Sequence, residues 1–127
     1  MVYRLETERL RLREWLPGDG QRLAAMNADR RVMEFFPHPL SRAESDAFFD
    51  RIVAEWAESG RGLYAVERRG DGRLIGLTGL HRAAFEASFT PCIEIGWRFV
   101  AEVWGQGYAT EAARAVLHDA FGRLGLP

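Results

Sequence analysis

Two glycines, Gly105 and Gly107, stand just before a segment with helical spacing, in the stretch VWGQGYATEAARAVL at residues 103–117. Glycine inside a helix costs about 1 kcal/mol relative to alanine, so the bare backbone here must serve another purpose. The first N–H groups of a helix have no partner within it and carry partial positive charge. Glycines would let an anion approach these groups, and such a loop can hold a phosphate without any lysine. A tight turn with positive φ is the alternative, and these residues alone leave both interpretations open.

The types and spacing of the potentially reactive side chains exclude several kinds of catalytic or binding site. All 17 basic residues are arginine, so a lysine Schiff base is excluded. The single cysteine, Cys92, cannot form an intramolecular disulfide, and we expect a cytoplasmic protein. His38, His81 and His118 are far apart in the sequence, so we expect no metal site. GxGxxG and Walker patterns are absent, which disfavours ordinary dinucleotide or P-loop binding.

The composition is that of one globular domain. The chain has 127 residues, of which 47% are hydrophobic and 28% are charged, and its net charge is −1. This balance predicts no nucleic-acid partner, and no apolar stretch approaches the ~20 residues of a membrane span. Arg9, Arg11 and Arg13 alternate along the first segment, where we expect a solvated strand face in preference to a phosphate track.

Hydrophobic periodicity predicts the elements that come before the loop. Alternation in TERLRLREW indicates a half-buried strand, and a short helix follows within residues 18–36. Ser41 and Glu44 have capping-box spacing, so a second helix should begin there and end at Gly60. Helical spacing gives this second helix an apolar face made of Phe48, Phe49, Ile52, Val53 and Trp56.

The second half of the chain is predicted to be a hairpin, a strand and a helix. Asp71-Gly72 is a strong turn signal within a hairpin over residues 63–80. A strand at 92–100 and a helix at 109–124 complete the order β-α-α-β-β-β-α. Three tryptophans are predicted to lie in the core: Trp15, Trp56 and Trp97.

The segment EIGWRFVAEVWGQGYATEAARAVLHDAF, which surrounds the glycine loop, resembles the acetyl-coenzyme A motif of the GNAT superfamily of N-acetyltransferases. It is most similar to the branch of ribosomal-protein N-terminal alanine acetyltransferases, which shows Glu-Ile-Gly and then Trp-Gly-x-Gly-Tyr-Ala-Thr-Glu-Ala. ETERLRLREW, VMEFFPHPLSRAES and LIGLTGL also resemble this branch. The resemblance implies an α+β fold of the α/β/α GNAT type, with a mixed, mostly antiparallel sheet flanked by helices.

The resemblance also implies an activity. An acetyl group would pass from acetyl-coenzyme A to a primary amine, either a protein N-terminus or a small amine, by direct attack and without a metal. The pantetheine arm would bond to the backbone at Phe99 and Val100, with an N–H near Val100 polarising the thioester carbonyl. The pyrophosphate would be held by the backbone amides of Gln106, Gly107, Tyr108, Ala109 and Thr110.

A carboxylate can take the proton that the amine must lose, and Glu94 is the candidate general base. It alternates away from the apolar face, and the matching glutamate of the branch lies in the acceptor cavity. The alternative is an ion pair between Glu94 and Arg82 or Arg98. Glu111 lies in the first turn of the last helix, where we expect a structural role. A loop that either borders the acceptor site or plugs the core contains Phe35, Phe36 and His38.

The likeness further implies that residues 1–127 are a single domain, apparently truncated after its third main helix. The family's fifth strand would begin within residues 122–127, and its usual general acid would lie beyond them, so none is assigned. The strand at 92–100 would then be an open edge, and we expect self-association. The alternative function is a coenzyme-binding or oligomerising module of the same fold with weak or no catalysis.

Overall fold

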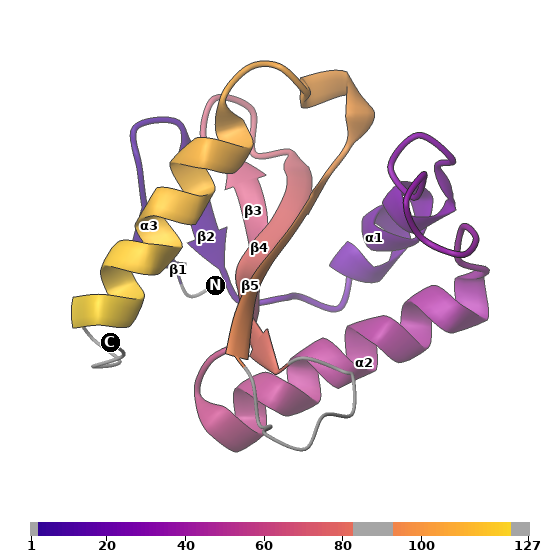
Figure 1. Cartoon of the computed structure of the whole chain (residues 1–127), viewed down its shortest axis with the longest axis horizontal. Helices are drawn as coiled ribbons and strands as arrows, with labels where there is room; N and C mark the ends of the chain where they lie inside the picture. Colours follow the sequence, from indigo (N-terminus) through magenta and orange to yellow (C-terminus); the bar gives the residue numbers. More distant parts are fainter. Residues whose placement is uncertain (1–2, 83–92, 123–127) are drawn as a thin grey trace.

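The computed structural model of the chain describes residues 3–82 and 93–122. Within them, five strands form one sheet in the order β1-β2-β3-β4-β5 (Figure 1). The strands are β1 (Tyr3–Glu6), β2 (Leu10–Arg13), β3 (Leu63–Arg68), β4 (Leu74–Arg82) and β5 (Ile93–Phe99). The helices are α1 (Asp19–Ala28), α2 (Arg42–Ser59), the 3₁₀ turn η1 (Ala101–Val103) and α3 (Tyr108–Gly122). The predicted α+β fold is confirmed, and every strand pair among the described residues is antiparallel.

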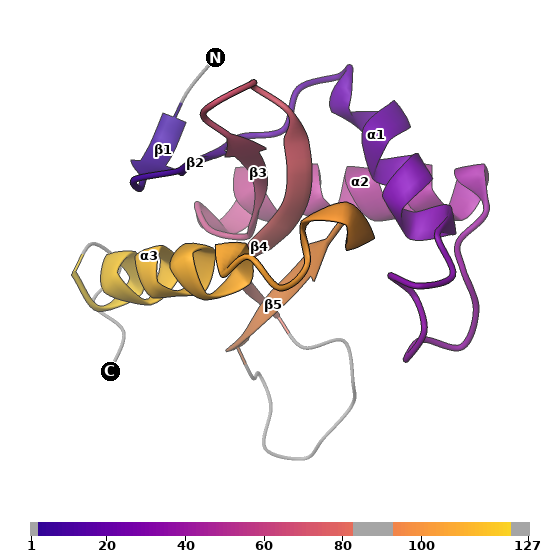
Figure 2. The ribbon, with the colours of Figure 1, turned by 90° about the horizontal axis from the view of Figure 1, so that it is seen from above.

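The sheet separates two hydrophobic cores, with α3 on one face and α1 and α2 on the other (Figure 2). Alternate side chains of a strand point to opposite faces, and the two central strands β3 and β4 contribute buried residues to both cores. The core under α3 contains Leu10, Leu12, Tyr64, Val66, Ile75 and Val116. The core under α1 and α2 contains Leu23, Met26, Ile52, Leu63 and Leu77.

The predicted signals at both ends of α2 are confirmed. The Ser41 hydroxyl accepts a hydrogen bond from the Glu44 N–H at 3.1 Å, and the Glu44 carboxylate accepts one from the Ser41 N–H at 2.9 Å. Gly60 ends the helix with φ of 71°, a value that favours glycine. The apolar face is narrower than predicted, because the side chain of Val53 is 44% exposed.

A β-bulge on β4 shapes the end of β5. Val66 pairs with Gly76 and Glu67 pairs with Leu74, so Ile75 is an extra residue on β4. The bulge explains why Ile75 packs under α3 while Leu77, two residues later, packs under α1 and α2. The Ile75 carbonyl accepts a hydrogen bond from the Val100 N–H at 2.9 Å, which fixes the chain as it leaves β5.

Two predictions about the sheet are wrong. The short strand β1 was not predicted, although it pairs with β2 as a hairpin. Trp97 was placed in the core with Trp15 and Trp56, but its side chain is 58% exposed. β5 has a neighbour on one side only within the described residues, so no further strand there covers the Trp97 ring.

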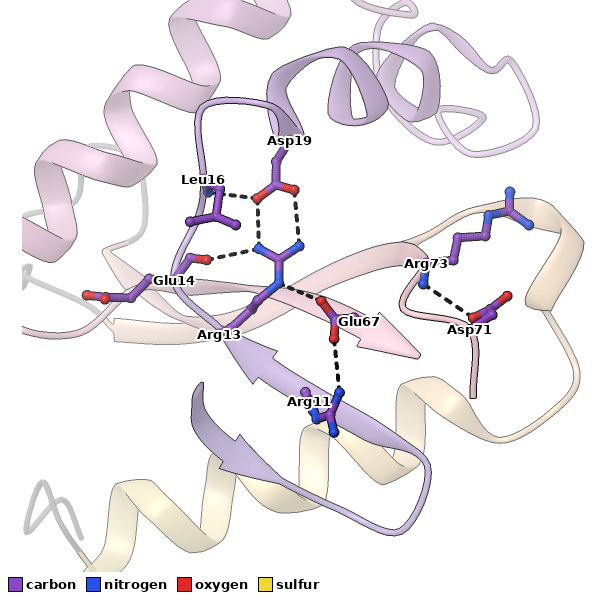
Figure 3. Close-up of polar contacts among 8 residues, drawn as sticks. All are labelled: Arg11, Arg13, Glu14, Leu16, Asp19, Glu67, Asp71 and Arg73. Atoms are coloured by element: carbon purple, nitrogen blue, oxygen red, sulfur yellow. Dashed lines mark hydrogen bonds and ion pairs between the residues drawn. The ribbon is translucent and has the colours of Figure 1, made fainter. Parts of the chain in front are cut away.

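The solvated face predicted for the first arginines is wrong at Arg13 (Figure 3), which is 4% exposed, whereas the side chains of Arg9 and Arg11 are 40% and 30% exposed. Its guanidinium donates two hydrogen bonds to Asp19, at 2.8 and 3.1 Å, and one to Glu67 at 3.0 Å. The second oxygen of Glu67 lies 3.5 Å from Arg11 Nη1. Burial opposes the charge, but the bonds to Asp19 and Glu67 raise the pKa of Arg13. This buried cluster ties the start of α1 to β2 and β3.

Candidate active site

The glycine loop lies between η1 and α3, at one end of the sheet (Figure 1). Gly105 and Gly107 both have φ of 80°, so the backbone reason for glycine at these positions is present. A Cβ on Gly105 would meet no atom within 4 Å, so this part of the loop faces open space. The turn and the accessible backbone, which the sequence left as alternatives, therefore occur together.

The amides of residues 106–110 donate no hydrogen bond to any described residue. The first such bond of α3 runs from the Glu111 N–H to the Gly107 carbonyl, at 3.0 Å. Unpaired N–H groups at a helix start carry the positive end of the helix dipole. Consecutive donors of this kind match the oxygens of a phosphate or pyrophosphate group.

Arg9 and Glu111 hold the loop against the turn between β1 and β2. Arg9 Nη1 donates to the Gln106 carbonyl at 2.9 Å, and Arg9 Nε donates to Glu111 at 2.6 Å. Glu111 also accepts bonds from the Arg9 N–H at 2.9 Å and from the Thr7 hydroxyl. Partial burial opposes ionisation, but these bonds lower the pKa of Glu111. The structural role expected for Glu111 is confirmed.

The side chain of Tyr108 packs inward. It is 9% exposed and belongs to the core under α3. The Arg9 guanidinium lies over its ring, 4.2 Å from the centroid. The side chain of Tyr108 therefore packs in the core, while its amide is one of the N–H groups at the helix start that donate to no described residue.

The backbone at Phe99 and Val100 is already hydrogen-bonded. The Val100 N–H donates to the Ile75 carbonyl at 2.9 Å, and the Phe99 carbonyl accepts from Trp104 Nε1 at 3.0 Å. The Val100 N–H, which we expected to polarise the thioester carbonyl, therefore already donates a hydrogen bond within the chain. The acceptor of the Val100 N–H is the carbonyl of Ile75, the extra residue of the β-bulge on β4. The sequence carries no signal for that bulge.

The family model described as the acetyltransferase (GNAT) domain matches residues 9–127. This chain belongs to the GNAT acetyltransferase family. The N-acetyltransferase YnaD of Bacillus subtilis (strain 168) is 29% identical over 123 residues, which span 96% of this chain and 68% of the relative. The predicted family and the predicted enzyme class are confirmed.

Solved structures agree with this GNAT assignment. The acetyltransferase from Agrobacterium tumefaciens str. C58 superposes with a TM-score of 0.83 at 29% identity, covering 100% of this chain and 71% of that one. The ribosomal-protein-S5-alanine acetyltransferase of Vibrio fischeri has a TM-score of 0.69 at 15% identity, covering 99% of this chain and 70% of that one. At such an identity the second likeness shows the fold alone.

For Glu94, the candidate general base of this GNAT domain, the structure describes the backbone only. Glu94 pairs with His81 across β4 and β5, and the side chains of both lie outside the described residues. Arg98, one of the suggested ion-pair partners of Glu94, makes no ion pair with any described residue. The side chain of Arg82, the other suggested partner, also lies outside the described part.

The loop between α1 and α2 is not a core plug as a whole. Phe35 is 94% exposed, and the His38 side chain is 59% exposed. Phe36 is 45% exposed, and its ring lies against Arg98 of β5. The loop therefore reaches the end of β5 that leads to Phe99 and Val100.

The described segments contain neither a cluster of metal ligands nor a helix that could span a membrane. Across residues 3–82 and 93–122, no three His, Cys, Asp or Glu side chains converge as metal ligands would. None of the helices in these segments has both the length and the hydrophobicity of a membrane span.

Proposed function

We propose that this GNAT domain binds acetyl-coenzyme A and transfers its acetyl group to a primary amine. The observation that carries the proposal is the run of amides at residues 106–110, none of which donates a hydrogen bond within the described part of the chain. They would hold the pyrophosphate without any cationic side chain, which suits a loop whose carbonyl at Gln106 is bound by Arg9, a guanidinium already paired with Glu111. The pantetheine arm would then extend along Phe99 and Val100.

For this reaction the protein must place the amine beside the thioester carbon and supply a proton acceptor. The amine nitrogen forms a bond to the acetyl carbon, the carbon–sulfur bond breaks, and the thiolate leaves to gain a proton. Glu94 is proposed to take the proton that the amine loses. Polarisation of the thioester by the Val100 N–H would require the bond to the Ile75 carbonyl to open. A protein N-terminus and a small amine both remain proposed acceptors, and the cytoplasm remains the predicted location.

Replacing Glu94 with glutamine tests its assigned role. We expect Glu94→Gln to lower kcat by about 10²–10⁴-fold, since a positioned general base contributes that much. The affinity for acetyl-coenzyme A should stay unchanged. Thiol release during acetyl transfer measures the first quantity, and calorimetric titration measures the second.

Glu58→Gln is the matched control, because Glu58 is an exposed residue near the end of α2. It removes the same charge and should leave both kcat and the coenzyme affinity at the values of the unmodified chain. An unchanged kcat in Glu94→Gln would remove Glu94 from the role of base. A chain that neither binds acetyl-coenzyme A nor releases thiol would overturn the proposed function itself.

A further inference from the structure

Arg98 is a half-buried arginine on the face of β5 that α1 and α2 cover. Its Nη1 donates a hydrogen bond to Asn27 Oδ1 of α1 at 2.5 Å. Its guanidinium carbon lies 4.7 Å from the ring centroid of Phe36 and 5.1 Å from that of Phe48. Three segments, namely α1, the following loop and α2, therefore surround one cation.

No carboxylate of a described residue lies within ion-pair distance of Arg98. Its Nε is buried and has no hydrogen-bond partner, and Nη2 makes no hydrogen bond to a described residue. Burial lowers the pKa of Arg98, but an arginine side chain stays protonated in proteins. A buried N–H donor that finds no hydrogen-bond partner among the described residues costs free energy, so the retained Nε donor of Arg98 points to a ligand.

Arg13 shows that the same chain can neutralise a buried arginine. Two carboxylates, Asp19 and Glu67, bind its guanidinium within 3.1 Å. Arg98 is also desolvated, yet it has an amide oxygen and two aromatic rings in place of a carboxylate. The difference between these two arginines singles out Arg98 as the one that can still receive an anion.

The two remaining N–H donors of Arg98, Nε and Nη2, favour one class of anion, a carboxylate. Nε and Nη2 lie on one edge of a guanidinium, and their N–H bonds point the same way, so this edge can donate two parallel hydrogen bonds to a carboxylate that displaces the atoms now covering Nε. Asn27 binds the other side of the group and is itself fixed, because its Nδ2 donates to the Ser45 hydroxyl at 3.0 Å. Asn27 and Ser45 are both fully buried, so the fork is preorganised.

The position of Arg98 connects it to the proposed reaction. It lies two residues before Val100, a separation of about 7 Å in extended chain. We propose that Arg98 binds a carboxylate of the acceptor, so that the acceptor is an amine carrying a carboxylate close to the reacting nitrogen. An amino acid and the N-terminus of an acidic peptide share this chemistry, whereas a polycation such as spermidine does not. This inference rests on the proposed function, because it concerns the acceptor of that reaction.

Binding of acetylated products tests the inference without depending on turnover. The first pair of probes is N-acetyl-L-alanine and N-acetyl-L-alaninamide, which differ only in the carboxylate. The second pair is an N-acetylated Ala-Asp peptide amide and its Ala-Asn counterpart, which represent the peptide source. We expect the carboxylate member of at least one pair to bind about 10-fold more tightly, ~1.4 kcal/mol, because charged groups form stronger hydrogen bonds than neutral ones.

Three variants test whether Arg98 causes the preference for the carboxylate probes. Arg98→Met should abolish it, and Arg98→Lys should reduce it, because lysine keeps the charge but lacks the two-donor edge. Arg114→Met is the matched control, since Arg114 is an exposed arginine of α3 and its loss changes the net charge equally. The control should retain the full preference, and every variant should retain the affinity for acetyl-coenzyme A.

The outcomes separate the two proposals. A preference that Arg98→Met or Arg98→Lys removes establishes the carboxylate site, and the pair that shows it identifies the source. Equal affinity within both pairs, or no saturable binding of any probe, overturns the inference even if acetyl-coenzyme A binds. A preference that a folded Arg98→Met retains, or that a folded Arg98→Lys retains undiminished, also overturns it, and Arg98 then only fastens β5 to α1 through Asn27. If the unmodified chain does not bind acetyl-coenzyme A, that result instead contradicts the proposed function.

Discussion

At the scale of single residues, the charges of this chain divide into those paired inside the fold and those left for a ligand. Arg13 illustrates the first kind, with Asp19 and Glu67 around one buried guanidinium (Figure 3). The gain from such a cluster over apolar packing is small, because all its members lose hydration. Its consequence is positional, because the ion pair between Asp19 and Arg13 joins the first residue of α1 to β2.

Removing the central cation of this cluster should therefore be strongly destabilising. We expect Arg13→Met to lower the free energy of unfolding by about 3–5 kcal/mol, because two buried carboxylates would lose their partner. Urea denaturation followed by tryptophan fluorescence measures the change. Arg51→Met, at an exposed position of α2, is the control and should shift the unfolding free energy by less than about 0.5 kcal/mol. Equal midpoints for the two variants would contradict this role of Arg13.

At the scale of elements, the chain fixes the start of α3 from the opposite edge of the sheet. Glu111 joins the first turn of α3 to the connection between β1 and β2, through Arg9 and Thr7. Since Arg9 also holds the Gln106 carbonyl, this connection sets the position of the whole glycine loop. The loop geometry therefore depends on the N-terminal hairpin, which lies 97 residues away in sequence.

The lowered pKa of Glu111 gives this contact a pH dependence. A carboxyl group with a lower pKa in the folded chain stabilises the fold above its ordinary pKa, here 4.5, and loses that effect as the pH falls through the folded-state value. We expect Glu111→Gln to reduce stability by about 1–3 kcal/mol at neutral pH, through lost charged hydrogen bonds. Thermal unfolding of both proteins across pH 3–7 should show the difference shrinking toward the acidic end. A difference that is constant over this range would show that ionised Glu111 contributes nothing.

Signals confined to neighbouring residues were predicted correctly from the sequence. The capping box of Ser41 and Glu44, the ending at Gly60 and the Asp71-Gly72 turn each depend on contacts within a few residues. The glycine loop belongs to the same class, because positive φ and an open helix start are local properties.

Features that depend on distant partners were missed. Arg13 looks like a surface arginine in its own strand, and only the packing of Asp19 and Glu67 against it makes it buried. Trp97 follows the apolar alternation of β5, but its exposure is decided by which strand lies beside it. The engaged Val100 N–H depends on the bulge at Ile75. The surroundings of Arg98, an amide and aromatic rings with no carboxylate among the described residues, likewise depend on α1 and on the loop that follows it.

At the scale of the whole molecule, one edge of the described sheet carries exposed aromatic surface. β5 has β4 on one side only among the described strands, and Trp97 is 58% exposed. Trp104, which follows η1, is 50% exposed. An edge strand with unpaired backbone groups and apolar side chains favours pairing with another chain.

We therefore expect this chain to self-associate at micromolar concentration. Sedimentation velocity should show a dimer or a larger species, and Trp97→Glu should shift the distribution toward the monomer, because a charge on an edge strand opposes pairing. Val53→Glu, which places the same charge on an exposed apolar residue of α2, should leave the distribution unchanged. A monodisperse monomer of the unmodified chain would contradict the expectation.

The central claim is that the glycine loop holds the phosphates of acetyl-coenzyme A, and calorimetric titration of the chain with that compound tests it most directly. Gly107→Val and Gly60→Val form a matched pair, because both place a β-branched residue at positive φ and pay a similar backbone cost. We predict saturable binding that Gly107→Val weakens by about tenfold or more, ~1.4 kcal/mol, and that Gly60→Val leaves unchanged. No saturable binding to the unmodified chain, or equal affinities of the two variants, would contradict the claim.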